Sequence, residues 1–228
     1  MIDMKDVWKT YPDGTHAIRG ITLKVESGEF VYIVGPSGAG KSTFMKMIYR
    51  EERPTQGQLF VNGFDLDKVK ARKIPHLRRN IGVIFQDFRL LPKLTVFENV
   101  AFAMEVIETP KKLIKNRTTE VLEMVKLADK AGSLPTQLSG GEQQRVAIAR
   151  AIVNSPSVII ADEPTGNLDP ETSMGIMKLM EDINYRGTTI VMATHNKEIV
   201  NTMRKRVIAI EKGQVARDEW RGEYGYED

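Results

Sequence analysis

One short stretch decides the fold of this chain, and it reads Gly35-Pro36-Ser37-Gly38-Ala39-Gly40-Lys41-Ser42. The stretch fits the pattern G-x-x-x-x-G-K-[ST] without a gap. An apolar run typical of a strand precedes it, and an amphipathic helical pattern begins after Lys41. Glycines let backbone N–H groups approach phosphates closely, and the following helix presents its positive N-terminal end. We therefore expect a phosphate-binding loop between a strand and a helix rather than an ordinary glycine-rich turn.

The same stretch predicts which atoms meet a nucleoside triphosphate. Lys41 is expected to reach the β- and γ-phosphates, and the Ser42 hydroxyl is expected to ligate Mg²⁺. The other residues expected around the phosphates are Gly35, Pro36, Ser37, Gly38, Ala39, Gly40 and Thr43.

Four short runs rich in β-branched or aromatic residues recur along the chain, at 30–34, 81–85, 158–161 and 189–193. They do not alternate polar with apolar residues, so both faces of the predicted strands should be covered. Amphipathic helical patterns lie between them, after Lys41 and around 117–128, 142–154 and 171–184. This alternation predicts an α/β fold with a mainly parallel sheet.

Polar side chains directly follow the last three runs. Ligands of open α/β sheets bind beyond the carboxyl ends of the strands, so these side chains should share one site with the phosphate loop. Asp162 suits a carboxylate that holds Mg²⁺ through water, and Glu163 can orient or deprotonate an attacking water. His195 is expected to contact the γ-phosphate, and Gln86 to sense Mg²⁺ and the attacking water. Alone, each of them would be read as an ordinary strand exit or a structural histidine.

A second anion site is predicted where Leu138-Ser139-Gly140-Gly141-Glu142-Gln143-Gln144 opens a helix that runs to about Asn154. Ser139 and Glu142 have the S-x-x-E spacing of a capping box, which fixes the start of the helix. The two glycines leave backbone N–H groups bare at the positive helix end. Capping alone does not account for them, because glycine is a poor helix former.

These motifs occur in one order along nearly the whole chain: the phosphate loop, Gln86, LSGGEQQ, the IIADE strand end, Gly166-Asn167-Leu168-Asp169 and His195. In this order they resemble the ATP-binding cassette (ABC) ATPases. The resemblance implies a P-loop NTPase fold with a RecA-like core, an N-terminal antiparallel β-subdomain and an inserted α-helical subdomain. We expect a single ABC ATPase domain over 1–228, with the core and β-subdomain in 1–87 and 155–228 and the helical subdomain in 88–154.

The resemblance further implies a homodimer in which two copies sandwich two ATP molecules head to tail. Ser139 and Gly141 of one copy would then contact the γ-phosphate held by Lys41 of the other. Gly140 would belong to the same nucleotide-binding set, and Asp169 would lie across the interface.

The resemblance also suggests that Tyr11 stacks on the adenine ring, with Trp8 as a competing candidate. Two departures from the commonest family pattern stand out. Glu142 replaces a more frequent Gln, and Gly-Asn-Leu-Asp replaces Ser-Ala-Leu-Asp at 166–169. Either side chain at 142 can complete the capping box and the aspartate is kept, so we expect hydrolysis to be retained.

The sequence of residues 74–92 resembles that of the branch of this family that acts in bacterial cell division. That resemblance implies an integral membrane partner, contacted through residues 87–102, and indirect control of cell-wall hydrolases. The ATPases of lipoprotein release and macrolide export share every catalytic motif and remain the alternative. A substrate importer fits less well, because many importer ATPases carry a C-terminal regulatory domain that we do not expect after the last strand here. A soluble cassette protein fits less well, because the chain has one cassette and no long insertion. A further alternative is an ATP-dependent clamp in which binding matters and hydrolysis is incidental. The intact Glu163, the candidate catalytic carboxylate, argues against it.

Composition sets the remaining expectations. The chain has no cysteine, no signal-peptide pattern and no apolar run near the roughly 20 residues that span a bilayer. We expect it at the cytoplasmic face of the plasma membrane, held there by its partner. A formal net charge of +3 does not argue for nucleic acid. The basic stretch at 68–79 either touches a phosphate surface or is a solvated connection. The tail at 218–228 is expected to be loosely ordered.

Overall fold

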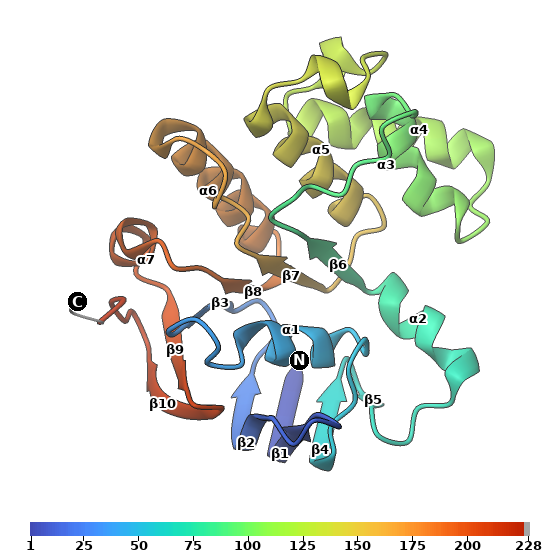
Figure 1. Cartoon of the computed structure of the whole chain (residues 1–228). Coiled ribbons are helices and arrows are strands. Elements are labelled where there is room, and N and C mark those ends of the chain that lie inside the picture. The colour runs from blue at the N-terminus through green and yellow to red at the C-terminus, as the bar shows by residue number, and fades with distance from the viewer. Residues whose placement is uncertain (226–228) are drawn as a thin grey trace.

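The computed structural model describes residues 1–225 and contains two sheets (Figure 1). The larger sheet has the strand order β10-β9-β3-β8-β7-β6. Its five neighbouring strands from β9 to β6 are parallel, and β10 is antiparallel to β9. The bounds are β3 (Phe30–Val34), β6 (Ile81–Ile84), β7 (Val158–Asp162), β8 (Thr189–Ala193), β9 (Arg206–Glu211) and β10 (Gln214–Glu219). The four predicted runs are therefore strands of one mainly parallel sheet.

Both faces of the larger sheet are covered, as the absence of alternation predicted. Phe30, Tyr32 and Val34 of β3 pack into an apolar cluster with the long helices that follow β6 and β7. Val31 and Ile33 point the other way, into a second cluster with the helix after the phosphate loop and the smaller sheet. Successive side chains of a strand point to opposite faces, so a strand with no exposed face has no need of polar positions.

The smaller sheet is antiparallel and has the order β2-β1-β4-β5. Its strands are β1 (Ile2–Thr10), β2 (His16–Val25), β4 (Gln56–Val61) and β5 (Phe64–Asp65). Buried apolar residues such as Ile2, Met4 and Leu59 fasten it to the second cluster. This sheet is the N-terminal β-subdomain that the resemblance implied.

The helices fill the connections between strands. They are α1 (Lys41–Ile48), α2 (Ile74–Arg79), α3 (Val96–Glu105), α4 (Lys111–Met124), α5 (Gly140–Ile152), α6 (Pro170–Tyr185) and α7 (Lys197–Met203), with 3₁₀ turns η1 (Ala71–Lys73), η2 (Ala128–Lys130) and η3 (Pro135–Gln137). The helices α3, α4 and α5 all lie between β6 and β7 and stand together at one end of the molecule (Figure 1). The division into subdomains at residues 87 and 155 stays a prediction.

Two sequence expectations were wrong in detail. The helix expected at 117–128 is α4, which begins earlier, after Pro110, and ends before Lys126, whose φ is +61°. The tail is ordered through residue 225, because the N–H of buried Tyr224 donates to Asn201 Oδ1 at 2.7 Å and Arg217 donates to the carbonyl of Tyr224 at 2.7 Å. Residues 226–228, the end of that tail, lie outside the described residues.

Within residues 1–225, no helix is long and apolar enough to cross a membrane.

Candidate functional site

The phosphate loop lies between β3 and α1, where it is pressed against neighbouring backbone. A Cβ atom at Gly35 would lie 2.1 Å from the carbonyl oxygen of Ile210, and one at Gly40 would lie 2.3 Å from that of Ala17. Both glycines have positive φ, 144° and 107°. Larger residues are therefore excluded twice, by space and by backbone conformation. The glycines that the motif requires thus hold the loop against β9 and β2.

The first turn of α1 has the features of an anion site. It has no acidic residue, and no side chain caps it. In residues 1–225, the N–H groups of Ser37, Gly38 and Gly40 donate no backbone hydrogen bond outside regular elements. These donors lie at the positive end of a helix dipole, so they can take up phosphate oxygens without breaking a bond within the loop.

Lys41 reaches back over the loop that precedes it. Its ammonium donates to the carbonyl oxygens of Gly35 at 2.7 Å and Pro36 at 3.0 Å. Burial lowers the pKa of Lys41, while the nearby carboxylates of Glu163 and Asp162 oppose the shift. The loop therefore curls around a cation that is held close to both carboxylates.

The strand order brings the other predicted residues together. Because β7 lies between β6 and β8, Asp162 and Glu163 stand between Gln86 on one side and His195 on the other. Asp162 pairs in register with Ala193, so the ends of β7 and β8 are level. The shared edge that the sequence predicted is present, and the phosphate loop follows β3, the next strand beyond β8.

Glu163 and His195 lie within hydrogen-bonding distance, with 2.5 Å between Glu163 Oε2 and His195 Nδ1. The Glu163 side chain is half-buried and that of His195 is exposed. Glu163 has a φ of +49°, an uncommon conformation for a non-glycine residue, and its N–H donates to the Ala193 carbonyl at 2.9 Å. This bend turns the Glu163 side chain from β7 toward the end of β8.

Asp162 is partly buried and has an unusual environment. Burial raises the pKa of its carboxyl group, and the adjacent Glu163 raises it further, whereas Lys41 lowers it. Within the described chain, no group donates a hydrogen bond to this carboxylate. A half-buried carboxylate beside another carboxylate fits a divalent cation, whose positive charge would stabilise the ionised form of both.

Gln86 contacts the loop that follows Glu163. Its Nε2 lies 3.4 Å from Asn167 Oδ1, and Asn167 Nδ2 donates to the Gln86 carbonyl at 3.1 Å. From the sequence alone, Asn167 stands out only as a departure from the commonest family pattern. Its pairing with Gln86 gives that departure a structural role, and the departure itself was the signal that could have revealed it.

The predicted helix start at Ser139 is confirmed. Ser139 Oγ accepts from the N–H of Glu142, whose carboxylate in turn accepts from the Ser139 N–H at 2.9 Å, and this completes the capping box. The same geometry gives Gly141 a packing role, because a Cβ there would lie 2.4 Å from Thr172 Cγ2 in α6. Asp169 caps α6, and hydrogen bonds from the Thr172 side chain and from the Thr172 N–H, the latter at 2.9 Å, lower the pKa of Asp169.

Gln144 is a second residue that the sequence reasoning missed. It is fully buried in α5, and its Nε2 donates to the carbonyl of Pro164 at 2.7 Å. This bond joins α5, the helix that begins within the LSGGEQQ motif and that we call the signature helix, to the residue after Glu163. The signal was a polar residue at helical spacing from the apolar Ala147 and Ile148.

Tyr11 is the better placed of the two aromatic candidates. Its hydroxyl lies 3.1 Å from Thr43 Oγ1 in the first turn of α1, and the ammonium of Lys9 sits 4.9 Å from its ring centroid. Trp8 instead donates from its indole to Asp6 and packs beside Gly20. Only Tyr11 therefore adjoins the phosphate loop.

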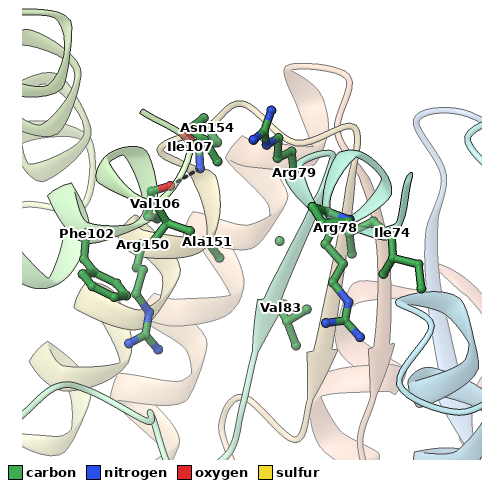
Figure 2. Close-up of a pocket in the computed structure, with 14 residues that line it drawn as sticks. Ile74, Arg78, Arg79, Val83, Phe102, Val106, Ile107, Arg150, Ala151 and Asn154 are labelled. Atoms are coloured by element: carbon green, nitrogen blue, oxygen red, sulfur yellow. Dashed lines mark hydrogen bonds between the residues drawn. The ribbon is translucent and has the colours of Figure 1, made fainter. Parts of the chain in front are cut away.

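A separate groove of about 510 Å³ opens beside β6 (Figure 2). One wall comes from α2 and β6 and the other from α3 and α5. Its lining is mainly apolar, with the guanidinium groups of Arg78, Arg79 and Arg150 at its border (Figure 2). Of the segment 87–102, which we expected to meet a partner, only Phe102 lines this groove.

The site thus combines a phosphate loop, a carboxylate pair, a histidine and a second anion-binding helix, which together define an ATP-hydrolysing cassette. The family model described as ABC transporter matches residues 18–166, and the chain belongs to this family. It is an ATPase.

The cell division ATP-binding protein FtsE of Bacillus subtilis is 67% identical to this chain over the full length of both. FtsE of Streptococcus pneumoniae D39 is 61% identical, covering 100% of this chain and 99% of the relative. FtsE of Mycobacterium tuberculosis is 54% identical, covering 99% and 98%.

Solved structures agree with the fold. The ATP-binding cassette MJ0796, in a dimeric post-hydrolysis state bound to ADP and Pi, has a TM-score of 0.86 at 37% identity and covers 97% of this chain and 99% of its own. CbiO1 of Clostridium perfringens, part of the transporter complex CbiONQ, has a TM-score of 0.90 at 31% identity and covers 96% and 88%.

Proposed function

We propose that two copies of this chain pair head to tail around two ATP molecules, and that the pair drives a membrane partner of the FtsX type in bacterial cell division. The location of the second anion site, at the start of α5, is the observation that supports the head-to-tail pairing of two copies. The groove at the start of α5 is lined by residues from 139–145 and 167–175 and by no residue of the phosphate loop. This lining supports the proposal that a phosphate at that helix end belongs to a nucleotide held by another copy. The dimeric MJ0796 cassettes support this arrangement.

In the proposed reaction, Glu163 orients the attacking water and accepts its proton, and His195 holds the carboxylate and contacts the γ-phosphate. Lys41 exchanges the loop carbonyls for the β- and γ-phosphates. Tyr11 stacks on the adenine, and the residues of the loop from Gly35 to Thr43 enclose the phosphates. From the second copy, Ser139, Gly140 and Gly141 donate to the γ-phosphate while Asp169 lies across the interface.

Mg²⁺ fits the oxygen donors at this edge. The ligands would be the Ser42 hydroxyl, the Gln86 amide oxygen and, through water, the Asp162 carboxylate, whose lack of a hydrogen-bond donor matches that role. When bound, the ion neutralises negative charge on the phosphate oxygens.

The membrane partner is proposed to dock beside β6, in the groove of Figure 2 and along the neighbouring residues 87–102. Phe102 and Val106 expose 43% and 63% of their surface there, which is more apolar area than an unpartnered wall needs. Arg78 and Arg150 are fixed by backbone carbonyls and pair with no carboxylate in residues 1–225. The docking segment is therefore expected to be an amphipathic helix with carboxylates at its edge. Through it, ATP turnover at the cytoplasmic face would regulate cell-wall hydrolases outside the membrane.

A pull-down from native membranes tests this function. Tagged Glu163→Gln protein with ATP should recover a small multi-span protein with an extracytoplasmic domain, together with division proteins. The same protein carrying Phe102→Glu, which places a charge on the exposed wall of the groove, should lose that partner yet still dimerise with ATP. Recovery of a lipoprotein-release or export permease instead would refute the cell-division assignment while leaving the ATPase intact.

A further inference from the structure

Lys130 contacts the signature helix from outside it. The residue ends the turn η2, and its ammonium binds Glu142 Oε1. The other oxygen, Glu142 Oε2, accepts from the Ser139 N–H at 2.9 Å and from the Ser139 hydroxyl at 3.0 Å. Both oxygens of one carboxylate are thus occupied, one by the lysine and one by the serine that the proposed function directs at a phosphate.

This arrangement has an electrostatic consequence. Glu142 brings a negative charge to a helix end where a triphosphate must approach, and like charges repel. The more frequent glutamine at this position would bring none. Contact with Lys130 is the first cause that lowers the pKa of Glu142, and Glu142 in turn raises the pKa of Lys130, so both groups are charged at neutral pH. In residues 1–225, Lys130 makes the one ion pair of Glu142.

The serine is restrained by the same contact. A hydroxyl has a single hydrogen to donate, and that of Ser139 is donated to Glu142. To meet a phosphate oxygen, the hydroxyl must turn its hydrogen away from the carboxylate. Glu142 then keeps two donors, the Ser139 N–H and Lys130, so its charge stays compensated when the serine turns.

We propose that Lys130 is a positioning residue for the composite ATP site. It holds the Glu142 carboxylate and cancels its charge, which lets the phosphates of a nucleotide on the second copy reach Ser139 and the N-terminal end of α5. The inference rests on the proposed head-to-tail pairing. It also explains how this chain carries a glutamate in the signature sequence without losing an anion site.

The test measures how much ATP is needed to form a dimer. All proteins carry Glu163→Gln, so that ATP-bound dimers accumulate, and are followed by analytical ultracentrifugation across an ATP titration. Lys130→Ala should raise the ATP concentration for half-maximal dimer by about two- to fivefold, the range of an exposed ion pair. Adding Glu142→Gln should bring it back to the value of Glu142→Gln alone, because the charge that Lys130 cancels is then absent. Lys115→Ala, which removes an exposed cation from α4, should leave the curve in place.

Each outcome bears on a different claim. A Lys130→Ala curve equal to that of the parent overturns the inference alone. A weakened dimer that Glu142→Gln fails to recover assigns Lys130 a merely structural role and also overturns it. If the parent forms no dimer at any ATP concentration, the head-to-tail pairing fails and this inference fails with it.

Discussion

The approach of α5 to α6 at Gly141 gives the most discriminating prediction, because Gly141 has two proposed roles that can be separated. A Cβ at this position would lie 2.4 Å from Thr172 Cγ2, about 1 Å closer than ordinary contact. Forcing an extra methyl group into such a contact costs about 1–3 kcal/mol. Alanine in place of glycine in a helix returns about 1 kcal/mol. Gly141→Ala should therefore lower the free energy of unfolding by about 0–2 kcal/mol.

Thr172→Ser removes the methyl group that causes the clash. The next nearest atoms of Thr172, Cβ and Oγ1, lie 3.7 and 3.8 Å from the added Cβ, which is normal contact. The double variant Gly141→Ala/Thr172→Ser should then be about 1–3 kcal/mol more stable than Gly141→Ala. Urea unfolding followed by circular dichroism measures this difference, with Thr172→Ser alone as the control.

The function of the double variant separates the two roles. If phosphate must approach the bare backbone of Gly141, the restored protein should still dimerise poorly with ATP. Recovery of stability and ATP-driven dimerisation together would show that the glycine serves packing only. A double variant no more stable than Gly141→Ala would refute the close helix approach itself.

Three further results are expected. Lys41→Ala removes a charge that faces the phosphates and should raise the Kd for ATP about ten- to hundredfold, the equivalent of about 1.5–3 kcal/mol, in an equilibrium binding assay. Arg206→Met leaves the carboxylates of Asp218 and Glu29, each 2.7 Å from the buried guanidinium, without their partner, and should cost about 3 kcal/mol in urea unfolding. Contact with Lys130 lowers the pKa of Glu142 below its ordinary value of 4.5, so the contact stabilises the fold above that pH and stops doing so as the pH falls through the lowered pKa. Lys130→Ala should therefore lower the free energy of unfolding at pH 7, and the loss should shrink progressively below pH 4.5. Urea unfolding at several pH values measures this difference.

The strands of the core were predictable from sequence because both of their faces are buried. In such a strand every residue is apolar, as in the run that contains Val31 and Ile33. The predicted bounds of the four apolar runs therefore agree within one residue with those of β3, β6, β7 and β8. The polar residues that end these strands were predictable for the same reason, since parallel strands place their carboxyl ends at one edge. The small antiparallel sheet came from the resemblance to the family.

Contacts that join distant segments could not be predicted. Burial of Tyr224 depends on Asn201 and Arg217, and the local sequence around 218–225 is polar and lacks any period. The bond from Gln144 to Pro164 and the pair formed by Gln86 and Asn167 likewise exist only because α5 and the loop after β7 meet in space. Local patterns specify the elements, whereas these side chains respond to how the elements are packed.

The groove beside β6 spans the joint between two parts of one chain. Its α2 wall stands beside β6 of the larger sheet, and its α3 and α5 wall belongs to the helices inserted between β6 and β7. If the inserted helices turn as a unit relative to the sheet, the width of the groove changes, and a segment bound between the two walls would sense that change. Gln86 follows β6, where the chain leaves the sheet for the inserted helices. Rotation of those helices would change the width of the groove where the partner segment binds. Because coupling between two binding sites is reciprocal, binding of the partner would in turn change the affinity for nucleotide.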